Sequence, residues 1–424
     1  MAISLGFVTA LQLCFPKYFM KLRPFWVLLH RYIGLAMTAF LIIVGLTGSL
    51  LAFLKELDGA INPQFAVAIQ SERPLDPATL LETSERIDPS IKADAIWLTE
   101  QAATVTVSPR LNHETPYDQL IFNPYTGELL GKRHWGDLSQ GLENLMPFIY
   151  KLHYELALGE IGVWALGITA LIWTLDCFVG FYLTLPLTKT KHPAPTTVIS
   201  KTFWQRWQLA WLIKWSASKP RITFDLHRAG GLWLWIALLI FAWSSVYMNL
   251  GDIYSKAMQS VSEYHQPWSD FPDLTEPVQD PKISWRQAQD IAQAELNRVS
   301  QTQGITILVP SGFWLNRAKG FYVYDIKSSA DVQDHGGNTR VVIDANNGSV
   351  KQVLLPTGQY SGNTITSWLL ALHTANVWGL PFQSRPNCYK TDEFWFRQAK
   401  AKHLHKPSVQ FFSGSCNNRS LEQL

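Results

Sequence analysis

Residues 29–35 read LHRYIGL and residues 225–232 read DLHRAGGL, and each stretch begins a long apolar run. In both, a His-Arg pair is followed by glycine four residues after the histidine and by leucine one residue later. Histidine is costly in lipid and is a common ligand of haem iron. His30 and His227 at these positions therefore indicate a function in a membrane.

A second pattern also occurs twice. In Leu152-His153 and in Leu372-His373, a glycine follows six residues after the histidine. Both patterns occur once in each half of the chain, and so long a period favours duplicated domains over a solenoid of short repeats. We therefore expect a tandem duplication in which each half has a His-Arg helix, an outward domain and a Leu-His helix.

The composition combines apolar blocks with polar blocks. Hydrophobic residues make up 47% of the 424 residues, yet the mean hydropathy is close to zero. Several of the 18 tryptophans flank the apolar runs, which is typical of a membrane–water interface. The four cysteines form no CxxC motif, and Cys177 lies inside an apolar run, so we expect no disulfide framework and no zinc or iron–sulfur site.

Three segments contain the roughly 20 mostly apolar residues that a spanning helix needs. Residues 30–54 form the first expected span, residues 151–187 hold a Leu-His segment and the second, and residues 230–250 form the third. Residues 365–383 are uncharged but contain His373, Asn376 and Pro381, so they are interpreted as the remnant of a fourth span. The polar tail, residues 384–424, cannot cross a bilayer.

Basic residues predict the orientation. The loop 188–229 holds eight lysines and arginines against one acid, Asp225, and the N-terminal segment 1–29 is also basic near its end. The positive-inside rule places both in the cytoplasm and residues 55–150 and 251–364 on the opposite side, periplasmic or extracellular, so we expect a multi-pass membrane protein. Residues 1–19 lack the features of a cleaved signal peptide and are interpreted as an over-extended start or a short interfacial helix.

Each long outward segment has the same order of patterns. Helical periodicity around residues 77–87 and 284–299 is followed by strand-like runs and then by a hairpin signal at Gly127 or Gly348. The predicted fold is therefore an α-helical integral membrane protein with two extracytoplasmic α+β domains, 55–150 and 251–364, and with its fourth span missing or altered. Aromatic residues of the second domain are expected in its core, although some could face a substrate; they are Trp268, Phe271, Phe313, Trp314, Tyr322 and Tyr324.

The expected topology sorts four histidines into two pairs of matching depth. His30 and His227 lie on the cytoplasmic side, and His153 and His373 on the outward side. A bis-histidine haem needs two imidazoles about 4 Å apart across the iron, so each pair is a candidate haem site. The other seven histidines lie in loops and are assigned no ligand role. The alternative is that the four histidines are interfacial polar anchors and the His-Arg pairs are basic flanks of spans.

Neighbouring residues fit either interpretation. Glycines near the histidines would let a flat macrocycle approach a helix, or would serve only helix packing; they are Gly34, Gly159, Gly230 and Gly231. Arg31 and Arg228 could meet haem propionates or lipid phosphates. Asp176 is an acid inside a span and thus a functional candidate, but its sequence neighbours do not identify its partner.

These stretches, together with Leu46–Ser49, Lys151–His153 and the two hairpins, resemble the PepSY-associated transmembrane proteins, also called iron-regulated membrane proteins, which include siderophore-iron reductases. The resemblance covers roughly residues 21–382. It implies a multi-pass protein of the bacterial inner membrane with four spans, two PepSY domains in the periplasm, and b-type haem held by helix-end histidines. By position it implies that His30 and His227 ligate an inner haem b, and that His153 and His373 ligate an outer one. The chain departs from the family after Phe382, where a fourth span is expected.

The resemblance implies a haem-dependent oxidoreductase that reduces ferric siderophore iron during iron uptake. Reduction releases the metal because ferrous iron binds hard oxygen chelators less strongly. No GxGxxG motif follows a strand, so the electron donor is expected to be quinol or a cytoplasmic reductase; the expected partners are this donor, the ferric siderophore and the lipid bilayer, and no nucleic acid. The alternatives are a non-enzymatic PepSY protein that binds a ligand or restrains a peptidase, and a transporter, which the few intramembrane charges disfavour.

Overall fold

The computed structural model describes residues 22–187 and 202–377. The interpretations of residues 1–19 and of the tail 384–424 lie outside these residues. Two described helices are long and apolar enough to cross a membrane, α3 (Arg23–Leu51) and α7 (Glu160–Thr184). A third span is possible if α9 (Lys219–Trp233) and α10 (Trp235–Asn249), which meet at a bend of 67°, act as one.

The first span begins earlier than residue 30. Helix α3 starts at Arg23, with Pro24 in its first turn, because the apolar residues 25–29 continue the helix ahead of His30. His30 therefore lies about two turns inside α3 and not at its start. Leu35 and Leu46 of α3 are 64% and 65% exposed. Such exposure of apolar side chains is expected for a helix face that contacts lipid, because the structure contains no bilayer.

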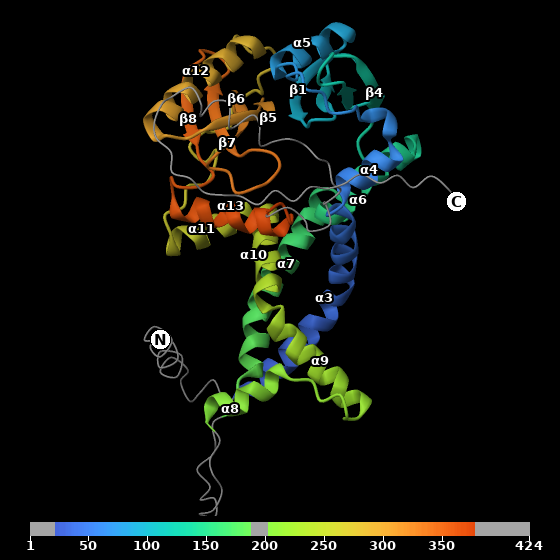
Figure 1. The fold of residues 1–424 in the computed structure, drawn as a ribbon, viewed down its shortest axis with the longest axis vertical. Helices are drawn as coiled ribbons and strands as arrows, with labels where there is room; N and C mark the ends of the chain where they lie inside the picture. Colours follow the sequence, from blue (N-terminus) through green and yellow to red (C-terminus); the bar gives the residue numbers. More distant parts are fainter. Residues whose placement is uncertain (1–21, 188–201, 378–424) are drawn as a thin grey trace, which may run out of the picture. The chain divides into compact units, whose positions relative to one another are not determined.

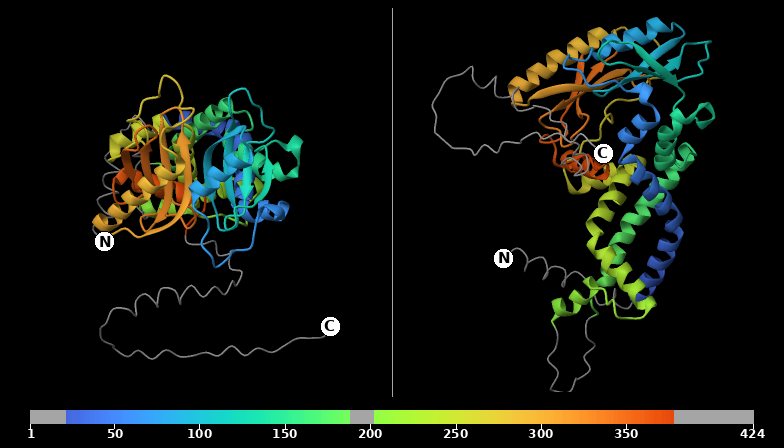
Figure 2. Two further views of the ribbon diagram at one scale, coloured as in Figure 1. Left: turned by 90° about the horizontal axis from the view of Figure 1, so that it is seen from above. Right: turned by 45° about the vertical axis from the view of Figure 1, so that its right-hand side comes forward.

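The third expected span, 230–250, is broken at Leu234 in the structure. Gly230 and Gly231 lie just before the break, and glycine costs about 1 kcal/mol in a helix interior, so the chain bends where helix propensity is weakest. His227 lies in α9, before the bend. Figures 1 and 2 show α10 and α3 on either side of α7, and both contact it.

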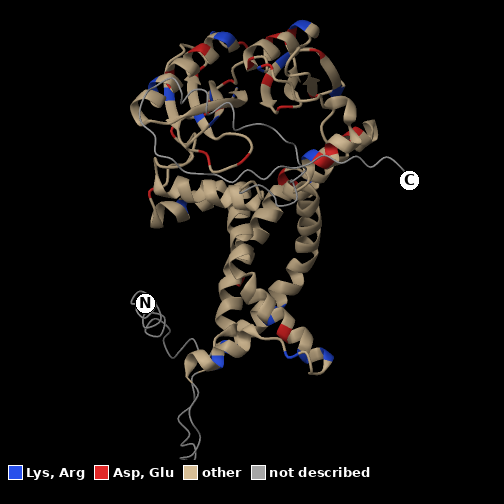
Figure 3. Cartoon of the chain, in the orientation of Figure 1, with Lys and Arg blue, Asp and Glu red and all other residues tan. Residues whose placement is uncertain are grey.

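Shorter helices adjoin the spans. Helix α4 (Leu54–Ile61) follows α3, and α6 (Leu145–Glu155) precedes α7. Helix α11 (Gly251–Val261) follows α10, and α13 (Ser361–His373) packs against α10. With 13 residues, α13 is about 20 Å long, too short to cross a bilayer. The described part of the expected fourth-span remnant is thus a docked helix. At the other end lie α8 (Phe203–Trp207) and α9, where Figure 3 shows lysine and arginine.

The α+β region is one antiparallel sheet of eight strands, in the order β4-β3-β2-β1-β5-β6-β7-β8. The strands of its first half are β1 (Ile91–Leu98), β2 (Ala103–Pro109), β3 (Gln119–Phe122) and β4 (Leu129–Arg133). Those of the second half are β5 (Ile307–Asn316), β6 (Phe321–Ser328), β7 (Thr339–Asp344) and β8 (Val350–Leu354). The hairpins predicted at Gly127 and Gly348 are present, with φ of +73° and +74° at these glycines.

The two expected outward domains are joined through β1 and β5. Ile96 pairs with Phe313 and Ala95 with Trp314, so the sheet is continuous across both halves. Helices α5 (Pro77–Ile87) and α12 (Trp285–Gln303) pack against each other and against the sheet. Their shared core means that neither half buries its apolar face alone.

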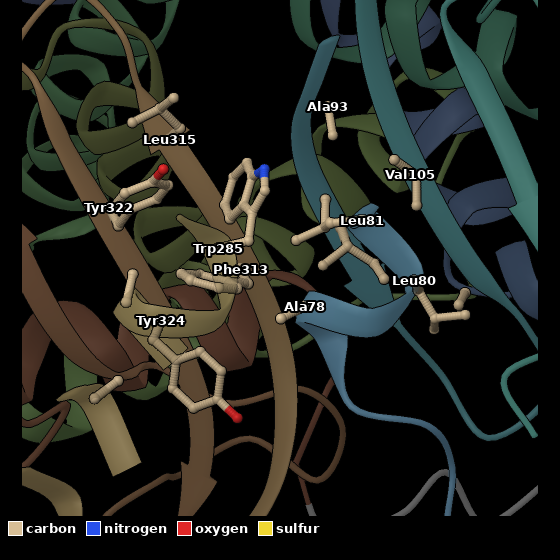
Figure 4. Packing of buried hydrophobic residues seen from close by; sticks show 14 of the residues in the cluster. Ala78, Leu80, Leu81, Ala93, Val105, Trp285, Phe313, Leu315, Tyr322 and Tyr324 are labelled. Atoms are coloured by element: carbon tan, nitrogen blue, oxygen red, sulfur yellow. The ribbon is translucent and has the colours of Figure 1, made fainter. Parts of the chain in front are cut away.

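Trp285 of α12 is at the centre of this core. Its ring lies 4.8 Å from those of Phe313 and Tyr322, and Figure 4 shows Leu81 of α5 beside it. Phe313, Tyr322 and Tyr324 are fully buried, which confirms them as core residues. Trp268, Phe271 and Trp314 pack, partly buried, around Phe321 in a second cluster.

Candidate functional site

The structure brings the four predicted histidines together as two pairs. We call His30 of α3 and His227 of α9 the basic-side pair, and His153 of α6 and His373 of α13 the sheet-side pair. The ring centres are 5.9 Å apart in the basic-side pair and 6.3 Å apart in the sheet-side pair. The two histidines of each pair come from opposite halves of the sequence.

These separations fit two imidazoles on one iron. A metal lies about 2 Å from each ligating nitrogen, which puts the two ring centres about 6 Å apart. Both observed distances agree with this value. In the basic-side pair His30 is half-buried and His227 is exposed, so the rings of this pair are accessible from outside the helix bundle.

The partner of His30 is Asp176, the acid that the sequence analysis singled out. Nδ1 of His30 lies 2.9 Å from both carboxylate oxygens of Asp176, whose side chain is only 8% exposed within α7. A carboxylate accepts a hydrogen bond, so Nδ1 of His30 carries a proton, and in the neutral ring Nε2 would be the nitrogen that could bind a metal.

The histidines of the sheet-side pair have hydroxyl partners. Nδ1 of His153 lies 3.0 Å from Oγ1 of Thr47, and Nδ1 of His373 lies 2.6 Å from Oγ of Ser244. Each hydroxyl donates its single hydrogen to the carbonyl four residues earlier, at 2.7 Å for Thr47 and 2.6 Å for Ser244. It must then accept from the imidazole, so both rings carry the proton on Nδ1 and present Nε2.

The sheet-side histidines are also in the right protonation state. Burial lowers the pKa of His153, and burial together with His153 lowers the pKa of His373 to about 4. Both rings are therefore neutral at neutral pH, the form that binds a metal.

Two glycines bring helices close to the histidine rings. A Cβ added at Gly180 of α7 would lie 3.2 Å from Cε1 of His30, and one added at Gly48 of α3 would lie 3.0 Å from Cε1 of His153. Both distances are shorter than ordinary van der Waals contact. Each pair thus has one histidine packed over a glycine of a neighbouring helix.

Other glycines leave space on the faces where the histidines project. Gly34 and Gly231 each follow a basic-side histidine by four residues, so they lie one turn away on the same face. A Cβ added at either, or at Gly230, would meet none of the described atoms within 4 Å. These positions fit the approach of a macrocycle. Gly159 has φ of +61° and joins α6 to α7, so its role is in the connection.

Arg228 is engaged within the protein. It donates to Asp225 at 2.8 Å and to the carbonyl of Leu209 at 2.7 Å, which ties α9 to the segment before it. Arg31 is exposed on α3. Of the two arginines that could meet haem propionates or lipid phosphates, Arg31 is the one on the surface.

A cavity of about 730 Å³ is lined in part by α6 and α10, the helices that carry His153 and Ser244. Tyr150 and Tyr154 flank His153 on α6, and Tyr247 follows Ser244 on α10. Among the described residues, the lining has aromatic, amide and hydroxyl groups and none of the side chains of Asp, Glu, Lys or Arg; its other members are Trp135, Met248, Asn249, Gly251, Ser255, Tyr264, Gln266, Pro267 and Trp268.

Sequence reasoning missed Thr47, Gly48, Gly180 and Ser244. Thr47 and Gly48 belong to the stretch Leu46–Ser49 that carried the family resemblance, so a signal was present there. Ser244 and Gly180 lie within apolar runs as ordinary small residues, and only the three-dimensional contacts distinguish them.

Comparison with known proteins agrees with the spans and the α+β region. Among curated proteins no significant match was found. The family described as the PepSY-associated TM region matches residues 27–384, which include all four histidines, the whole of α7 and α3 from its fifth residue onward. The chain therefore belongs to the PepSY-associated TM region family.

Proposed function

We propose that the protein is a b-type haem protein of a bacterial inner membrane that passes electrons outward and reduces ferric iron held by a siderophore. The observation that carries the proposal is the geometry of the two histidine pairs, 5.9 Å and 6.3 Å between ring centres. Haem bound at each pair would supply a one-electron carrier. Family membership supports the proposal and fits either this activity or a non-enzymatic binding role.

The separation of the pairs along α3 supports transfer across the membrane. His30 belongs to the basic-side pair, and Thr47, which accepts from His153, lies further along the same helix. The distance from His30 to Thr47 is about 26 Å at the rise of an α-helix, close to the hydrocarbon core's thickness of about 30 Å. The two sites would lie near opposite faces of the bilayer.

The aromatic cavity lined in part by α6 and α10 is the proposed place for the ferric complex. Its uncharged lining suits a bulky chelate, and Tyr150 and Tyr154 of this lining belong to α6, the helix that carries His153, so the path for the electron would be short. Each ferric ion takes up one electron, and the ferrous product is held less strongly by hard oxygen ligands and leaves. The electron comes from quinol or from a reductase on the basic side.

The test is reduction by the purified full chain in lipid vesicles that enclose a membrane-impermeant reductant. A ferric siderophore and a chromogenic chelator specific for ferrous iron are added outside. Wild type is expected to produce ferrous iron outside, and His227→Ala and His373→Ala are expected to lose this activity. His113→Ala, which changes an exposed loop histidine, is the matched control.

Activity in His373→Ala and His227→Ala equal to that of His113→Ala would refute the proposal. A folded, membrane-inserted wild type that contains no haem would favour the binding role instead. In that case the sheet and the cavity would serve recognition of a ligand or peptidase.

A further inference from the structure

The hydrogen-bond partners of the histidines differ between the two pairs. On the basic side, His30 donates to the carboxylate of Asp176. On the sheet side, His153 and His373 face hydroxyl groups that already donate to backbone carbonyls. One site therefore has a formal negative charge behind its ligand, and the other has neutral dipoles.

Asp176 is an unusual residue for its place. It is 7% exposed, lies in a helix that is long and apolar enough to span a membrane, and is the one acid of α7 after its first residue, Glu160. Burying a carboxylate in such a helix is costly, so such a residue usually has a functional role. Its contact with His30 shows where that role acts.

We infer that Asp176 is a positioning residue that lowers the reduction potential of haem at the basic-side pair below that at the sheet-side pair. The inference rests on the proposed function. A carboxylate that accepts from Nδ1–H makes the imidazole more basic, and a more basic ligand stabilises ferric over ferrous iron. The negative charge acts in the same direction, and it acts strongly where the local dielectric constant is low.

The consequence is a direction for electron transfer. One electron passes from the basic-side iron, which is oxidised, to the sheet-side iron, which is reduced. This transfer is thermodynamically favourable because the basic-side couple has the lower reduction potential. The hydroxyls of Thr47 and Ser244 hold their histidines in the metal-binding tautomer without adding charge. The unequal partners thus bias the chain toward delivery on the side of the sheet.

The size of the effect follows from general behaviour of such partners. Loss of an outer hydrogen-bond partner changes metal affinity by about 10- to 100-fold. If only the affinity for the ferric form changes, each factor of ten shifts the reduction potential of a one-electron couple by about 59 mV. Removing the charge of Asp176 should therefore raise the basic-side potential by about 60–120 mV.

The experiment is an optical redox titration of the purified full chain in mild detergent, resolved into two components. Asp176→Asn keeps the shape and an acceptor oxygen but removes the charge. The lower-potential component is expected to rise, with the other unchanged and the haem content kept. Glu160→Gln, the same change of charge at an exposed position of α7, is the matched control and should shift neither component.

A second measurement does not depend on the folding of Asp176→Asn. In His227→Ala, which removes a ligand of the basic-side pair, the component that disappears must be the lower-potential one. Loss of the higher-potential component would overturn the inference, as would unchanged potentials in Asp176→Asn with both haems present. Those results would leave the proposed function intact, whereas a haem-free wild type would refute both.

Discussion

Substitution of Gly48 by alanine tests the packing of the sheet-side pair. The added Cβ would lie 3.0 Å from Cε1 of His153, closer than ordinary carbon contacts allow. The ring has little room to adapt, because Nδ1 is held by Thr47 and Nε2 would be held by the iron. The contact must be relieved by moving the ring or the helix, and either change strains the ligand geometry.

Overpacking of this kind costs about 1–3 kcal/mol, which corresponds to about a 5- to 150-fold loss of haem affinity at the sheet-side pair. The assay is titration of haem-depleted protein in detergent with haem, followed by absorption, which reports the two sites as separate phases. Gly48→Ala is expected to weaken one phase and leave the other unchanged.

Gly45→Ala is the matched control. It is one turn earlier on α3, and an added Cβ there meets no described atom within 4 Å. Both variants gain the same helix propensity, so the difference between them isolates the contact with His153. Equal haem affinity in Gly48→Ala and Gly45→Ala would refute the reasoning.

Three further predictions concern other contacts. Thr47→Val and Ser244→Ala remove the acceptors of the sheet-side imidazoles, so haem affinity at that pair should fall by about 10- to 100-fold in the same titration, with the basic-side phase unchanged. Trp285→Ala empties the centre of the shared core and should lower the free energy of unfolding of the α+β region by about 3–5 kcal/mol, measured by denaturant titration; a loss below about 1 kcal/mol would contradict the shared core. Hydrogen bonds from Ser90 and Tyr117 lower the pKa of Asp88 to about 2, so its contribution to stability is present above pH 4 and is lost as the pH falls through 2. The site is largely solvated, so the contribution is below about 1 kcal/mol, and Asp88→Asn should reduce the fall in thermal midpoint between pH 4 and 2 relative to wild type.

The sequence predicted those parts of the fold that depend on local patterns. Apolar length identified the helices that became α3 and α7, and glycine with positive φ marked both hairpins. The pairing of β1 with β5 was missed, because it joins strands from opposite halves of the sequence and no local signal specifies it. The break at Leu234 was missed because residues 230–250 carry no charge and are mostly apolar, and Gly230 and Gly231 were interpreted as sites of haem approach or helix packing and not as a weak point of the helix.

The candidate site divides in the same way. The four histidines and Asp176 stood out because polar residues are rare in apolar runs. Their pairing across α3, α9, α6 and α13, and the partners Thr47 and Ser244, depend on how helices pack, which a single sequence does not contain. The hydroxyls were inconspicuous because serine and threonine are common in spanning helices.

The central claim is that each histidine pair holds one haem. Its most direct test is the ratio of haem to protein in the wild-type chain purified in mild detergent, measured by the pyridine haemochrome method with the reduced-minus-oxidised spectrum. The account predicts a b-type spectrum with two haems per chain, falling to one in His227→Ala and to one in His373→Ala. A folded wild type without haem, or one whose haem content is unchanged by both substitutions, would contradict it.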